Sequence, residues 1–388
     1  MDFQLTDDQR AIAEAVKRIC ARFSDEYWSH KDSAAEFPHE FHAAMAEDGW
    51  LGITMPEELG GSNLGVTEAA VMMNAVAAGG GGAAAMSTLQ INLFAPHPIV
   101  VLGTPDQKKR MLRPLISGSE KTCFGVTEPN AGLNTTQIKT FAARVDGGYI
   151  VNGSKIWTST AQVADNILLL TRTTALEDCA RPTDGMTIFF TKLDRSKVEV
   201  RRIPKMGRAA VDSNSIFMQD FFIPEQDRIG EEGKGFQYLL HSLNPERIIV
   251  AAGAIGIAQD ALRRAAAYAK ERVVFGRPIG QNQSIQHPLA ELWCQIEAAW
   301  LVTMKASSLY DRKEPCGSHA NAAKLLGGRV AFDAATQAVL THGGMGYAKE
   351  YQVERLFRES ILQRLAPITE QLILCFIAEK ELGLPKSY

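Results

Sequence analysis

The sequence predicts an α+β protein of several domains, in which two helical regions flank a central antiparallel β-domain. Its 388 residues are enough for two or three domains. Apolar residues recur at helical spacing near both ends, whereas short β-rich segments between turn residues fill the middle. Hydrophobic residues make up 46% and charged residues 22% of the chain, as in ordinary globular proteins, which excludes a disordered chain.

The charge balance excludes two classes of partner. The 41 Lys and Arg residues nearly match the 44 Asp and Glu residues, for a net charge of −3. A protein that binds nucleic acid or an anionic membrane through its electrostatic field would be basic. The six cysteines are far apart and form no CxxC pair, which indicates a reducing compartment. The start, Met1–Gln4, lacks the basic and apolar regions of a signal peptide, so we expect a cytoplasmic protein.

The first zone, residues 1–122, is predicted to be helical. Thr6 and Gln9 form a capping box before apolar residues at helical spacing, namely Ile12, Val16 and Ile19. The segment Ala69–Pro105 contains no Asp, Glu, Lys or Arg and is long enough to cross a membrane. The four glycines Gly79–Gly82 and several polar residues interrupt it, so we predict two buried helices around a glycine-rich break and no membrane span.

The second zone, residues 123–233, is predicted to be a compact antiparallel sheet. Asp146-Gly147 and Asn152-Gly153 are turn pairs typical of hairpins. Four β-rich segments follow, each bounded by Pro, Gly, Asn or Asp: Ile167–Leu170, Met186–Phe190, Val198–Val200 and Ser215–Met218.

The third zone, residues 234–388, is predicted to be helical again. One helix carries an apolar stripe and is apolar nearly all round in its first half, which is typical of a central helix. The stripe consists of Ile248, Ala251, Ile255, Ala258 and Leu262. Pro245 suits the first turn of this helix, which would place Glu246 near its amino terminus.

Several signatures of other chemistries are absent. The sequence has no GxGxxG after a strand, no GxxxxGK[ST], no HExxH and no GxSxG. His39 and His42 are one helical turn apart, but no further ligand completes a metal site, so we predict none.

Four segments in order and in register resemble the acyl-CoA dehydrogenase family of flavoproteins. They are Phe124–Gly132, Lys155–Ser159, Tyr268–Ile279 with Gln283, and His342–Tyr347 followed by Glu354-Arg355 and Arg358-Glu359. The similarity extends from the first helices to about residue 380. It implies a helical domain, a β-domain and a carboxy-terminal four-helix bundle, and a tetramer built as a dimer of dimers.

The resemblance also implies FAD, bound between the β-domain and the bundle and completed by a neighbouring subunit. Residues at the isoalloxazine would be Phe124, Val126, Thr127, Trp157 and Ser159, and Ser159 stands where the family has a Thr whose hydroxyl meets flavin N5. Across the interface, the rest of the cofactor would contact Arg272, Phe275, Gln283, Gly343 and Gly344. Gly132 and Thr369 complete the predicted cofactor contacts. Arginine suits a diphosphate, and paired glycines let backbone N–H groups approach it.

The family's reaction needs a carboxylate that removes the α-proton of a thioester. In most members a Glu stands nine residues after an Arg like Arg358, but here that position is Pro367. Some branches place the base on the long helix of the last domain, just before an Arg, where this chain has Glu246. We therefore expect Glu246 to be the base, with Glu370 in a displaced loop as the alternative. The substrate contacts would include Leu243, Arg247, Ala366 and Pro367, and Pro367 lacks the backbone N–H that the family offers to the thioester carbonyl.

The resemblance implies FAD-dependent α,β-desaturation of an acyl-CoA to a trans-2-enoyl-CoA in fatty acid metabolism, with an electron-transfer flavoprotein as acceptor. The charge-free segment would form the apolar wall of the acyl pocket, with Gln90, Leu93 and Phe94 as candidates. Leu133 and Leu340 depart from the family pattern near the cofactor. Because Pro367 replaces the usual carboxylate, two other enzymes with the same fold stay open as alternative functions, namely a monooxygenase and an enoyl-CoA reductase. The third alternative is a non-catalytic subunit of a hetero-oligomeric dehydrogenase.

Overall fold

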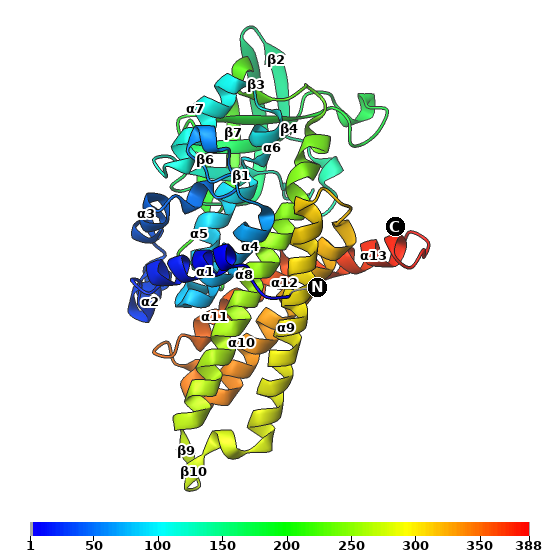
Figure 1. Cartoon of the computed structure of the whole chain (residues 1–388). Helices are drawn as coiled ribbons and strands as arrows, with labels where there is room; N and C mark the ends of the chain where they lie inside the picture. The colour runs from blue at the N-terminus through cyan, green and yellow to red at the C-terminus, as the bar shows by residue number, and fades with distance from the viewer. Residues whose placement is uncertain (1–2, 388) are drawn as a thin grey trace.

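A computed structural model describes residues 3–387. Helices occupy the beginning and end of the chain, and the sheet lies between them in the sequence and at one end of the molecule (Figure 1). The three-part α+β arrangement predicted from the sequence is therefore confirmed. The first two residues of the Met1–Gln4 segment lie outside the described residues.

The first part consists of helices that pack against the long helices of the last part. The helices are α1 Asp7–Cys20, α2 Asp25–Ala34, α3 His39–Glu47, α4 Val66–Val76, α5 Gly82–Phe94, α6 His97–Leu102 and α7 Pro105–Ile116. The capping box is confirmed, because the Thr6 hydroxyl accepts from Gln9 N and the Gln9 side chain accepts from Thr6 N. The glycine-rich break is also confirmed: η3, Ala77–Gly81, separates α4 from α5, with Gly80 at φ 96°.

The second part is a mixed sheet in which most pairings are antiparallel. Its strands are β1 Thr122–Gly125, β2 Phe141–Val145, β3 Gly148–Ser159, β4 Asn166–Arg172, β5 Met186–Lys192, β6 Val198–Arg202, β7 Ser213–Pro224 and β8 Arg228–Ile229. Their order is β6-β7-β3-β2-β4-β5-β8, with β1 beside β4. The predicted antiparallel sheet is confirmed for most pairings, whereas the β1–β4 and β2–β4 pairings are parallel. All four β-rich segments lie in the strands β4, β5, β6 and β7.

One of the two predicted turns is a turn and the other is not. Asp146-Gly147 joins β2 to β3, where Val145 pairs with Gly148. Asn152-Gly153 instead lies within β3, where the register against β7 shifts and Gly153 has φ 146°. The glycine is needed there for a β-bulge, because the strand continues beside Thr140 with no room for a side chain.

The third part contains three long helices and several shorter ones. They are α8 Gly235–Glu271, α9 Gln283–Asp311, α10 Gly317–His342, α11 Val353–Ser360, α12 Leu362–Leu365 and α13 Glu370–Lys380, with a small hairpin of β9 Val273–Val274 and β10 Arg277–Pro278 between α8 and α9. In Figure 1, α13 extends away from the body of the molecule. Most of its residues are partly or fully exposed.

The predicted start of the long helix is wrong. Helix α8 begins at Gly235, directly after the β-domain, so Pro245 lies inside it and Glu246 is far from its amino terminus. Packing against the β-domain explains the longer helix, because Phe236 and Leu239 join a cluster of sheet and α7 residues that compensates for the proline. The predicted apolar half is confirmed, since Ile248 to Ala258 are buried in the main core.

Within residues 3–387, two helical stretches are long and apolar enough to cross a membrane, judged by length and composition alone. Val66–Leu102 contains α4, α5 and α6, and 83% of its apolar 18-residue window is buried within the protein. Val353–Lys380 contains α11, α12 and α13, and 17% of its window is buried.

Candidate active site

A flat aromatic side chain marks one face of the β-domain. Trp157 is 58% exposed and has φ 61°, a left-handed conformation that is rare for a bulky residue. It sits where the register of β3 against β7 shifts between Lys155 and Thr158. Ile156 N donates to Thr127 O at 2.9 Å, so the Phe124–Thr127 segment lies directly beside Trp157. The structure thus brings the two predicted flavin-binding segments together.

A buried ion pair fixes these two segments. Lys155 Nζ lies 2.9 Å from Glu128 Oε1 and also donates to Val126 O at 3.1 Å. The other contacts of Glu128 come from the backbone N–H groups of Lys139 and Thr140. Burial lowers the pKa of Lys155 to about 8 although Glu128 opposes the change. Sequence reasoning assigned no role to this pair, and a lysine within a half-buried strand was the signal for it.

Glu246 is a buried carboxyl on α8. Its side chain is 8% exposed, and burial raises its pKa to about 7 although Arg247 and Lys324 favour the anion. No Lys, Arg or His nitrogen of residues 3–387 lies within 4.0 Å of its carboxylate. The sequence argument from the helix dipole does not apply, because Glu246 lies well inside α8. Burial alone therefore makes this group a base suited to neutral pH.

Lys324 organises the loop that contains Pro367. Its buried ammonium donates to Gln363 O at 2.5 Å and to Ile368 O at 3.5 Å, on either side of a cis Ala366–Pro367 peptide. Lys324 lies on α10, which packs against α8, and its charge favours the ionised form of Glu246. Lys324 thus connects the Pro367 loop with the helix that carries Leu243, Glu246 and Arg247.

The Glu370 carboxylate forms ion pairs with two arginines. Arg364 Nε donates to it at 2.6 Å and Arg329 Nε at 3.4 Å, and the Arg364 hydrogen bond lowers its pKa. The Thr369 hydroxyl accepts from Leu372 N at the start of α13. A carboxylate held in two ion pairs is a poor candidate for a displaced base.

Gly132 lies in the β-domain, between β1 and β2, whereas five further cofactor candidates lie at the other end of the molecule. They surround the tip of the long helices: Arg272, Phe275, Gln283, Gly343 and Gly344. Tyr268 stacks on His342 at 4.2 Å, which places the two glycines beside the end of α8. Helix α8 has 37 residues and is therefore about 55 Å long, so it places these residues far from the β-domain that packs against its start. Figure 1 shows the β9–β10 tip and the β-domain at opposite ends.

The comparisons with known proteins identify the family. Residues 6–119, 123–221 and 233–380 match the N-terminal, middle and C-terminal domains of acyl-CoA dehydrogenase. The chain is 34% identical to acyl-CoA dehydrogenase FadE12 of Mycobacterium tuberculosis over 99% of this chain and 98% of that protein. It belongs to the acyl-CoA dehydrogenase family.

Two further relatives extend the comparison. The structure of butyryl-CoA dehydrogenase from Megasphaera elsdenii has a TM-score of 0.92 and 31% identity, with 99% of this chain and 100% of that chain covered. The CarC subunit of the caffeyl-CoA reductase–Etf complex of Acetobacterium woodii is 33% identical over 89% of both chains. The acyl-CoA dehydrogenases are FAD-dependent oxidoreductases, and this chain is one of them.

The residues present fit FAD. The exposed indole of Trp157 offers a flat wall beside the partly exposed Ser159 hydroxyl. At the other end, a side-chain carbon at Gly343 or Gly344 would meet nothing within 4 Å, so a ligand can approach the backbone closely there, although the Gly343 N–H itself donates to Leu340 O. Phe275 is fully exposed with φ 52°, as expected of a residue that contacts something outside its own chain.

Proposed function

We propose that this acyl-CoA dehydrogenase desaturates its substrate between the α and β carbons, with Glu246 as the base that removes the α-proton. The observation that carries this proposal is the buried Glu246 carboxyl, free of ion pairs within the described residues and with a pKa raised to about 7. Near neutral pH such a group is partly ionised and accepts a proton readily.

The roles of the surrounding residues follow from their contacts. FAD supplies the hydride acceptor when it is bound. Lys324 holds the Pro367 loop in place and favours the Glu246 anion. Pro367 has no N–H, so the thioester carbonyl must receive its hydrogen bonds from other groups. Apolar helix α5 supports the pocket, since Phe94 packs edge-on against Phe124 at 5.4 Å between ring centres.

The decisive experiment compares two carboxylates. Glu246→Gln should bind FAD normally and abolish anaerobic bleaching of the flavin by acyl-CoA, tested with straight, branched and cyclic acyl groups. Glu370→Gln is the matched control: it removes the alternative base and should leave bleaching intact. Normal bleaching in Glu246→Gln, or its loss only in Glu370→Gln, would reverse the assignment.

We further propose a homotetramer in which the tip residues of one subunit complete the FAD site of another. The separation of the two candidate clusters within one chain supports this assembly. Arg272→Ala should weaken FAD binding although Arg272 is remote from Trp157 in its own chain, and sedimentation should give four subunits. A monomer that binds FAD stoichiometrically would contradict it.

For the setting of the reaction, we propose a cytoplasmic enzyme of fatty acid metabolism that passes electrons to an electron-transfer flavoprotein. The support is that CarC, a relative, is named as part of an Etf complex. We also propose that the chain divides into a helical domain at 1–122, a β-domain at 123–233 and a helical bundle at 234–388.

A second candidate function is reduction of a 2-enoyl-CoA with the same residues. It is favoured by the similarity to CarC, a subunit of a caffeyl-CoA reductase–Etf complex. Flavin absorbance distinguishes desaturation from reduction. In desaturation an acyl-CoA bleaches the oxidised enzyme, whereas in reduction an enoyl-CoA reoxidises the reduced enzyme.

A further inference from the structure

Arg208 is a buried cation that forms no direct ion pair within the described residues, although Glu359 and Asp212 act on it at longer range. Its side chain is 7% exposed and donates to the hydroxyls of Ser87 at 2.9 Å, Ser159 at 3.0 Å and Ser213 at 3.0 Å. Its Nε has no hydrogen-bond partner, and no carboxylate oxygen of the described chain lies within 4.0 Å of the guanidinium. All its partners are neutral hydroxyls on three different elements, α5, β3 and β7.

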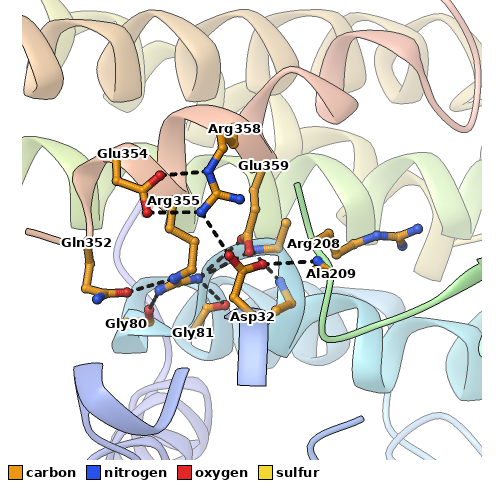
Figure 2. Close-up of polar contacts among 12 residues, drawn as sticks. Asp32, Gly80, Gly81, Arg208, Ala209, Gln352, Glu354, Arg355, Arg358 and Glu359 are labelled. Carbon is orange, nitrogen blue, oxygen red and sulfur yellow. Dashed lines mark hydrogen bonds and ion pairs between the residues drawn. The ribbon is translucent and has the colours of Figure 1, made fainter. Parts of the chain in front are cut away.

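The backbone around Arg208 is held in an unusual conformation. Arg208 has φ 57°, which is uncommon for a residue other than glycine. Its neighbours fix it: Ala209 N donates to Asp32 Oδ1 at 3.1 Å, and a side-chain carbon at Gly207 would lie 2.5 Å from Arg358 O. Figure 2 shows the Arg208 side chain pointing away from Asp32. Contacts from α2 and α11 thus hold the backbone so that the guanidinium lies against the three serines. Left-handed backbone conformations of residues other than glycine are concentrated at functional sites.

The bond to Ser159 constrains the direction of that hydroxyl. Because Ser159 Oγ accepts a hydrogen bond from a guanidinium, its own hydrogen is left to donate elsewhere. Ser159 is partly exposed, two residues from Trp157 along the same strand. A positive charge that has no direct ion pair and lies behind a donor strengthens that donor, and the effect is strong where water is excluded.

We propose that Arg208 is a positioning residue for the flavin, which orients the Ser159 hydroxyl as a donor to the ring and raises the midpoint potential of bound FAD. A reduced flavin carries more negative charge than an oxidised one, so a nearby unpaired cation stabilises it. The proposal rests on the proposed position of Ser159 beside the ring. It does not depend on the substrate or on Glu246, so failure of the dehydrogenase assignment would leave it standing.

The test measures the two-electron midpoint potential of the FAD-loaded protein by dye equilibration, without substrate. Arg208→Met should lower the midpoint potential. At a fixed solution potential the ratio of reduced to oxidised flavin should fall at least tenfold, and a tenfold fall corresponds to a shift of about 30 mV in the midpoint potential. Ser159→Ala should also lower it, and Arg208→Met should have less effect in the Ser159→Ala background. Ser213→Ala is the matched control, because it removes a hydroxyl on the same guanidinium nitrogen and should leave the potential unchanged.

The opposite results would overturn the proposal. An Arg208→Met protein that is less stable but has the wild-type potential and flavin spectrum would show that Arg208 only ties the domains together. If this variant does not fold or bind FAD, Arg208→Lys and Ser159→Ala carry the test. Lysine preserves the charge, so the reduced-to-oxidised ratio should stay within about threefold of wild type. Equal potentials in Ser159→Ala and wild type would then refute the role.

Discussion

Arg355 Nη1 lies 3.3 Å from Glu359 Oε1, and the two side chains are at most 1% exposed. This buried pair connects α11 with the glycine-rich break between α4 and α5 (Figure 2). Arg355 donates to Gly80 O at 2.5 Å and Gly81 O at 3.2 Å, and Glu359 accepts from Ala83 N at 2.9 Å. The cation thus meets carbonyls left free at the break, and the anion meets N–H groups at the start of α5.

Removing one member of this pair should be strongly destabilising. Glu359→Ala leaves a buried guanidinium without its carboxylate and the start of α5 without acceptors, so we expect a loss of about 3–5 kcal/mol in the free energy of unfolding. Urea denaturation measures it. The control is Glu314→Ala, which breaks the exposed Arg312–Glu314 pair and should change the stability far less. Similar losses in the two variants would contradict the role given to burial.

The raised pKa of Glu246 should appear in the pH dependence of the reaction. Only the anion accepts a proton, so kcat/KM should rise with pH through about 7. Lys324 favours the anion, so Lys324→Met should move this limb to higher pH. An unchanged limb in that variant would mean that another group titrates.

The same pKa predicts a cost in stability. The folded state holds the Glu246 proton more tightly than an exposed glutamate with a pKa near 4.5. The stability contributed by the protonated form is therefore complete below about pH 4.5 and is lost as pH rises through 7. Relative to Glu246→Gln, the wild type should lose about 3 kcal/mol between pH 4.5 and pH 8. Unfolding curves at both pH values give the difference, and parallel curves would rule out a buried, ionising Glu246.

Lys155 should contribute both to FAD affinity and to the stability of the β-domain. Lys155→Met leaves Glu128 buried without its cation and loosens the contact between the Val126 and Trp157 segments. We expect at least a tenfold weaker FAD affinity, measured by flavin fluorescence during titration, and a loss of about 3 kcal/mol in stability. Lys192→Met, at an exposed pair with Glu120, is the control and should retain FAD.

Gly256 allows α8 to approach α4 closely. A side-chain carbon there would lie 2.4 Å from Asn74 O in α4 and 2.9 Å from Ala77 Cβ in η3, and helical backbone fixes both atoms. Gly256→Ala should therefore lower stability by about 1–3 kcal/mol. Gly317→Ala, where the nearest atom is 3.8 Å away on Phe376, should be nearly neutral. Thermal unfolding of both proteins tests this.

Local signals in the sequence determined much of this protein. The capping box at Thr6, the hairpin at Asp146-Gly147 and the apolar half of α8 depend on nearest neighbours and on helical or strand periodicity, so they were predictable. The four family segments identified the fold and the cofactor. They also showed that Pro367 stands where a carboxylate is usual, which pointed to Glu246.

Only the tertiary structure decided features that depend on distant partners. The start of α8 at Gly235 depends on packing against the sheet, which outweighs the local preference of Pro245. Asn152-Gly153 has the composition of a turn, but pairing with β7 makes it a bulge. The raised pKa of Glu246 and the unpaired charge of Arg208 result from burial among residues far away in the chain, and burial is a property of the folded molecule.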